Sequence, residues 1–97
     1  MQKTIGTTQT ITRRKVFNEI VKFLPNLHIS IKSDETNKSL HHVSWNTVDS
    51  VGDVESSIIR GIKEVKKSVN NEEFRNMCFS VEHEGKTKLI YVRDRIG

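Results

Sequence analysis

The stretch DVESSIIRGIKEVKKSV, residues 53–69, carries the strongest structural signal in the chain. Its apolar residues recur at the three- and four-residue spacing that places side chains on one stripe of an α-helix. They are Val54, Ile58, Ile62, Val65 and Val69. Asp53 stands where an N-cap is expected, and its negative charge suits that end of the helix dipole. We therefore predict an amphipathic helix over residues 53–69, which must bury its apolar stripe against a second element.

A second helical pattern precedes it. The apolar residues that share its face are Val16, Phe17, Ile20, Val21 and Leu24. Pro25, the only proline, ends the pattern, which predicts a helix over residues 12–24 with Thr10 or Thr12 as N-cap. Residues 1–11 are rich in β-branched threonine, so we expect an N-terminal edge strand or a flexible arm there. Residues 12–97 are expected to form a single domain.

Two alternating stretches between the helices predict a hairpin. They are LHISIKS, residues 27–33, and SLHHVSWNT, residues 39–47, with the polar turn DETNK between them. An odd-length loop pairs Leu27 with Trp45, Ile29 with Val43, and Ile31 with His41. This register is preferred because an even loop would expose Trp45. It turns His41 toward the apolar side and His42 toward the opposite face.

The C-terminal stretch MCFSVEHEGKTKLIYVRDR, residues 77–95, predicts a second hairpin with a turn at Glu84 and Gly85. A two-residue turn pairs Phe79 with Ile90 and Met77 with Val92. Its other face then carries Leu89, Tyr91 and Arg93 beside Cys78 and Ser80. Just before this hairpin, NNEEFRNM predicts a short helical turn that buries Phe74.

These elements give the order (β)αββαββ and predict an α+β fold. Two helices, each with one apolar stripe, are expected to cover one face of a mainly antiparallel four- or five-stranded sheet, which makes a two-layer sandwich with one sheet face uncovered. With the N-terminal strand, the first six elements are similar in order to the ferredoxin-like arrangement of RNA-recognition domains. Neither SLHHVSWNT nor KLIYVRDR carries the aromatic signature of those domains, so no residue roles follow from this similarity.

Composition narrows the functional class. The 97-residue chain has 16 Lys and Arg against 12 Asp and Glu, a net charge of +4 that favours contact with polyanions or acidic surfaces. Cys78 is the only cysteine, which excludes an internal disulfide and favours a cytoplasmic location. No stretch is apolar enough for a membrane span, so no membrane partner is expected.

The uncovered sheet face is the first candidate site. The predicted registers gather five residues of interest there: Lys32, His42, Leu89, Tyr91 and Arg93. Tyr91 suits stacking on a base, while Lys32 and Arg93 suit neutralisation of phosphates. The alternatives are an ordinary solvated face or the seam of a homodimer.

A second candidate is RRK, residues 13–15, which the predicted boundaries place at the start of the first helix. Helix N-terminal amides attract anions, so Arg13, Arg14 and Lys15 are candidates for clamping a phosphate there. A solvated basic surface is the preferred interpretation of these three charges.

No catalytic, cofactor or compact metal-ligand motif occurs in the sequence. His28, His42 and Cys78 would converge only under a strand placement that the sequence does not establish, so neither metal nor cofactor is predicted. We therefore expect a non-catalytic nucleic-acid-binding module. The alternative is a small interaction or inhibitor protein that binds a larger protein partner, and either form is compatible with a homodimer.

Overall fold

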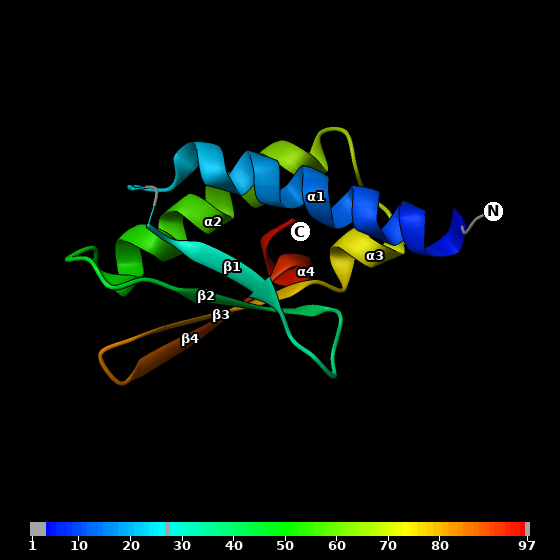
Figure 1. Ribbon diagram of the computed structural model, residues 1–97. Helices are drawn as coiled ribbons and strands as arrows, with labels where there is room; N and C mark the ends of the chain where they lie inside the picture. The colour runs from blue at the N-terminus through cyan, green and yellow to red at the C-terminus, as the bar shows by residue number, and fades with distance from the viewer. Residues whose placement is uncertain (1–3, 27, 97) are drawn as a thin grey trace.

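The computed structural model describes residues 4–26 and 28–96, and within them the chain has an α+β fold (Figure 1). In chain order the elements are α1 Thr4–Phe23, β1 Ser30–Ser33, β2 Leu40–Ser44, α2 Val51–Lys66, α3 Glu72–Arg75, β3 Cys78–His83, β4 Lys86–Tyr91 and α4 Val92–Arg95. The two long helices α1 and α2 pack on each other. The order αββαββ is confirmed for the main elements, without an N-terminal strand in the described residues.

The four strands form one mixed sheet in the order β1-β2-β3-β4. The outer pairs, β1–β2 and β3–β4, are antiparallel, as expected for hairpins. The central pair β2–β3 is parallel. Parallel neighbours need a long crossover, and α2 supplies it by carrying the chain from the end of β2 back to the start of β3. Two of the three strand pairs are therefore antiparallel, as predicted, but the parallel central pair was not predicted.

Helix α2 confirms the strongest prediction, with a shift at both ends. The N-cap is Ser50, not Asp53: the Asp53 amide donates to Ser50 Oγ at 3.1 Å, and the Asp53 carboxylate accepts from the Ser50 amide in return. This reciprocal capping box starts the helix at Val51. The helix ends at Lys66, and Val69 packs against the core from the connection that follows.

Helix α1 begins much earlier than predicted. The expected edge strand or arm over residues 1–11 is wrong for residues 4–11, which are helical, and residues 1–3 lie outside the described part of the chain. Each threonine makes a helix less stable than alanine would by less than about 1 kcal/mol, so a threonine-rich segment can still be helical. Thr12, predicted as a possible N-cap, lies inside the helix and is only 5 % exposed, and its Oγ1 accepts from the Asn71 amide.

The first hairpin has the predicted faces but a different pairing. Val43 lies opposite Ile31, and His41 lies opposite Ser33, so the predicted pairing of Ile29 with Val43 is wrong by two residues. The turn sets this register, because Asp34 accepts from the amides of residues 36 and 37 and shortens the loop. The predicted contact of Leu27 with Trp45 lies outside the described residues.

The second hairpin matches its prediction. Phe79 lies opposite Ile90, and Ser80 lies opposite Leu89. Glu84 and Gly85 both have positive φ, at 55° and 79°, which suits a tight two-residue turn between twisted strands. The short helix α3 buries Phe74, also as predicted.

A single hydrophobic cluster joins the two long helices to one sheet face. From the helices it takes Val16, Ile20, Val54, Ile58, Ile62 and Val65, and from the strands Val43, Phe79, Val81 and Ile90. Trp45 is also buried, and its indole nitrogen donates to the Asp49 carbonyl at 2.9 Å. The predicted inward orientation of Val43 and Trp45 is therefore confirmed.

Gly61 is the point of closest approach between α1 and α2. A Cβ atom added to Gly61 would lie 2.6 Å from both Cα and Cγ1 of Ile20. Backbone atoms cannot give way as a flexible side chain can, so a side chain at residue 61 would push the helices apart.

We predict that Gly61→Ala destabilises the protein by about 2 kcal/mol or more, because overpacking outweighs the gain in helix propensity of about 1 kcal/mol. Gly52→Ala is the matched control in the same helix, where an added Cβ would meet only Ser50 Oγ at 3.8 Å. Urea denaturation should show the control as stable as the parent or slightly more so. Equal stability of the two variants would contradict the close helix contact.

His41 is a core residue with no solvent exposure. Its ring packs edge-on against Phe17 at 5.1 Å between centroids and contacts Phe79 at 5.4 Å. Nδ1 lies 3.2 Å from Ser33 Oγ, while Nε2 finds no hydrogen-bond partner in the described residues. Burial, reinforced by the charges of Arg13 and His42, lowers the pKa of His41 to about 4. The ring is therefore neutral at pH 7.

The lowered pKa of His41 makes the free energy of unfolding depend on pH. In the unfolded chain His41 takes up its proton near pH 6.5, but in the folded chain only near pH 4. Between these values the unfolded state binds more protons, so the free energy of unfolding falls as the pH is lowered. We expect a loss approaching about 3 kcal/mol between pH 7 and 4, measured by urea denaturation.

His41→Leu should flatten this dependence, whereas His28→Gln, which changes an exposed ring, should preserve it. An unfolding free energy of the parent protein that stays constant from pH 7 to 4.5 would show that His41 is not buried in a neutral form.

Candidate functional site

The sheet face opposite the core forms a candidate surface that we call the open face. Side chains alternate between the two faces along each strand, so the register determines its members. They are Ser30, Lys32, Leu40, His42, Ser44, Cys78, Ser80, Glu82, Thr87, Leu89 and Tyr91. Most are exposed, while Leu40, Cys78 and Ser80 are half-buried. Four of the residues selected from sequence, Lys32, His42, Leu89 and Tyr91, thus share one face.

Two rows of side chains cross this face. One runs through Lys32, His42, Ser80 and Leu89, and the other through Leu40, Cys78 and Tyr91. Leu89 and Tyr91 are each 48 % exposed. Because they are two residues apart on β4, they form a continuous apolar surface at its edge.

His42 is exposed but already has a partner. Its Nε2 lies 2.7 Å from Asp34 Oδ1 in the turn that follows β1. This contact, together with hydrogen bonds from Thr36 and Asn37, holds the pKa of Asp34 well below its usual range. The Asp34 carboxylate places a negative charge beside His42, and Glu82 adds a further negative charge to the open face.

Arg93 lies outside the strand to which it was assigned. β4 ends at Tyr91, and Arg93 belongs to the short helix α4. Its guanidinium donates to Asn76 Oδ1 at 2.7 Å and lies 3.9 Å from the carboxylate of Glu72. It therefore lies two residues beyond Tyr91, at the border between the open face and α3.

The idea that residues 13–15 clamp an anion with the free amides of a helix N-terminus is wrong, because the helix does not begin there. Since α1 starts at Thr4, Arg13, Arg14 and Lys15 lie in its middle, where backbone amides are already used inside the helix. Arg13 is half-buried and close enough to His41 to affect its pKa, which places it on the core side of the sheet. The structure thus separates these three residues from the open face.

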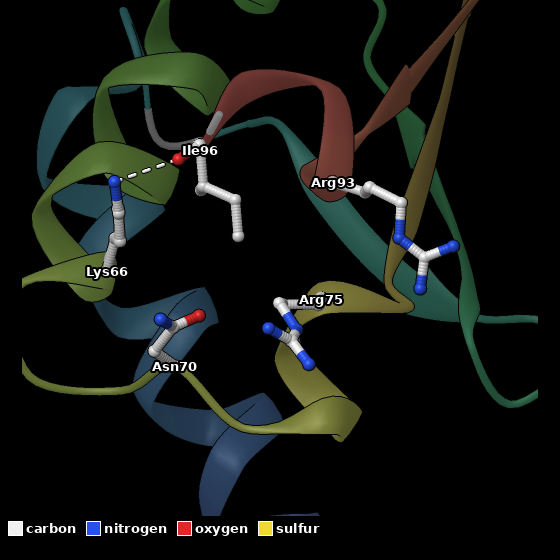
Figure 2. A pocket seen from close by; sticks show the side chains of 5 residues that line it. All are labelled: Lys66, Asn70, Arg75, Arg93 and Ile96. Atoms are coloured by element: carbon white, nitrogen blue, oxygen red, sulfur yellow. Dashed lines mark hydrogen bonds between the residues drawn. The ribbon is translucent and has the colours of Figure 1, made fainter.

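A pocket of about 480 Å³ opens between the ends of α2, α3 and α4. Figure 2 shows the residues that line it: Lys66, Asn70, Arg75, Arg93 and Ile96. Lys66 Nζ donates to the Ile96 carbonyl at 2.8 Å, and Arg75 is paired with Glu72 at 3.1 Å. The guanidinium of Arg93 is turned away from Lys66, toward the strands (Figure 2).

Sequence reasoning selected only Arg93 from this pocket. Lys66 lies in the last turn of α2, where a cation complements the helix dipole, and Arg75 lies in a short polar stretch without a recognisable motif. These residues become neighbours only through the packing of three helix ends. No local pattern in the sequence could have indicated this convergence.

The histidines do not form a metal centre in the part of the chain that the structure describes, because no three His, Cys, Asp or Glu side chains come close enough together to hold an ion. His83 stacks on Trp45 with 4.7 Å between ring centroids. His28 lines a second, shallow pocket of about 390 Å³ with Ser30, Ser44, Trp45 and Asn46. Burial raises the pKa of the Cys78 thiol, which makes it a weaker nucleophile at neutral pH.

Comparison with family models, with curated proteins and with solved structures found no match to this chain. Among the described residues, no helix has the length and apolar character that crossing a membrane requires. The function must therefore be argued from the open face and the adjacent pocket.

Proposed function

We propose that the protein is a non-catalytic nucleic-acid-binding module that holds a single strand on its open face. The observation that carries this proposal is the half-exposed ring of Tyr91, beside Leu89, on a sheet surface away from the core. Aromatic rings on sheet faces stack on unpaired bases, and any base can use such a platform.

Charge around this platform supports the same proposal. Arg93 follows Tyr91 on one side, and Lys32 begins the row of side chains that ends at Leu89. With a net charge of +4, these cations suit phosphates on either side of a stacked base. Negative charge from Asp34 lies beside His42, and Glu82 is itself negative, so we place the phosphate contacts at Lys32 and Arg93 and the base contact at Tyr91, on the β4 edge of the face.

Two structural inferences belong to this proposal. Because α1, α2 and the core-facing strand residues share one cluster, we infer a two-layer arrangement that leaves the open face to a ligand. The lone Cys78 further suggests a reducing, cytoplasmic setting, where nucleic acids are accessible.

We predict that the protein binds a fluorescent oligonucleotide, DNA or RNA, in anisotropy titrations carried out at about 50 and 200 mM salt. Binding should weaken steeply at the higher salt, because phosphate contacts release counterions. Tyr91→Ala should weaken binding by roughly 5- to 100-fold, the range of one lost stacking contact, while Tyr91→Phe should retain the ring and most of the affinity.

Charge variants give the second control. Lys32→Gln should reduce both affinity and salt dependence, whereas Lys63→Gln removes the same charge from the exposed side of α2 and should have a smaller effect. Absence of binding at the lower salt, or equal binding by Tyr91→Ala and the parent protein, would refute the proposed site.

A protein partner is the second candidate, favoured by one observation. Leu40, Cys78, Leu89 and Tyr91 form an apolar strip that reaches the β4 edge of the open face, with residues of both charges nearby. Apolar surface bordered by polar residues is typical of protein interfaces. The partner would be a larger protein that this chain covers or inhibits, or a second copy of the chain. Sedimentation analysis of the parent protein and of Leu89→Glu would then show association that the variant loses.

A further inference from the structure

The pocket between α2, α3 and α4 concentrates positive charge from separate parts of the chain. Lys66 comes from the last turn of α2, Arg75 from α3 and Arg93 from α4. Like charges repel, yet Lys66 and Arg75 line the same opening, while the Arg93 guanidinium is turned away from Lys66 (Figure 2). The volume of about 480 Å³ falls within the range of small-ligand sites.

Nearby acidic residues only partly neutralise these cations. Glu72 accepts from Arg75 at 3.1 Å and lies 3.9 Å from Arg93, and contact with Arg75 and Asn76 lowers its pKa. Glu72 is thus ionised, and among the described residues it is the one carboxylate that pairs with Arg75 and Arg93. Among the ion pairs of the described residues none involves Lys66, whose partner is the neutral Ile96 carbonyl.

Unused hydrogen-bond donors remain at this opening. Lys66 has three N–H groups and uses one on Ile96, and Arg75 has five and uses one on Glu72. Figure 2 shows the Asn70 amide between Lys66 and Arg75. A guanidinium and an ammonium beside an amide donor offer the charge-assisted hydrogen bonds that phosphate oxygens accept.

We propose that this pocket is a phosphate-binding site, with Lys66 and Arg75 as its main ligands and Asn70 as a further donor. The phosphate belongs either to the end of a nucleic-acid strand or to a free phosphate compound, since both present the same oxygens. Arg93 lies between this pocket and Tyr91, so a strand on the open face would have a route to it. The phosphate site itself does not depend on the function proposed above.

The experiment is a titration of the full chain with inorganic phosphate at about 50 mM salt, followed by ³¹P NMR and calorimetry. We expect saturable binding, and Lys66→Gln and Arg75→Gln should each weaken it about tenfold, as one lost charge-assisted hydrogen bond predicts. Arg75→Lys keeps the charge without the planar fork and should weaken binding less. Lys38→Gln changes an exposed lysine of the β1–β2 turn and should have no effect.

Circular dichroism and urea denaturation of each variant separate a binding role from a structural one, because Lys66 also holds the Ile96 carbonyl. No saturable binding up to about 10 mM phosphate would overturn the proposal. It would also be overturned if folded Lys66→Gln and Arg75→Gln bound phosphate as tightly as the parent protein.

A second experiment distinguishes the phosphate at the end of a nucleic-acid strand from a free phosphate compound. Oligonucleotides with a 5′-phosphate and with a 5′-hydroxyl are compared on the parent protein, on Lys66→Gln and on Tyr91→Ala. A preference for the phosphorylated end that disappears in Lys66→Gln supports a strand end in the pocket. Phosphate binding without any oligonucleotide binding supports a free phosphate compound, and it would leave this site standing while the function proposed for the open face fails.

Discussion

The close contact between α1 and α2 is the constraint on which the rest of this structure depends. Gly61 has no side chain, and the backbone of Ile20 occupies the space that a Cβ would need. This contact brings the apolar stripes of both helices into the same cluster as the inner strand residues. It is also the most extensive contact that α1 makes with any other element.

The sequence predicted those parts of the fold whose determinants are local. Periodicity located α2, and a two-residue turn at Glu84 and Gly85 fixed the pairing of Phe79 with Ile90. The first hairpin was predicted less well because side-chain hydrogen bonds set its boundaries. Asn26 accepts from the His28 amide before β1, and Asp34 organises the turn after it. Both are local contacts, but apolar alternation does not reveal them.

Other features depend on distant parts of the chain and could not be predicted from local pattern. The start of α1 was missed because its β-branched threonines are typical of strands, although they cost a helix little. Thr12 is buried where it accepts from Asn71, which is distant in the sequence. The parallel pairing of β2 with β3 follows from the path of α2, which periodicity does not specify. For the candidate site, alternation placed Lys32, Leu89 and Tyr91 on one face, but it could not bring Lys66 to Arg75.

The parallel central pair also bears on how the chain reaches its native state. The hairpin β3–β4 closes through a two-residue turn, and β1–β2 closes through a short loop, so each forms from neighbours in the chain. Joining the two halves requires Leu40 to meet Cys78 across the whole of α2. Contacts of such high sequence separation carry a large loop-closure entropy and slow the folding of small domains. The sheet therefore consists of two ribbons of local contacts joined by one long-range pairing, and this joining carries the larger loop-closure cost.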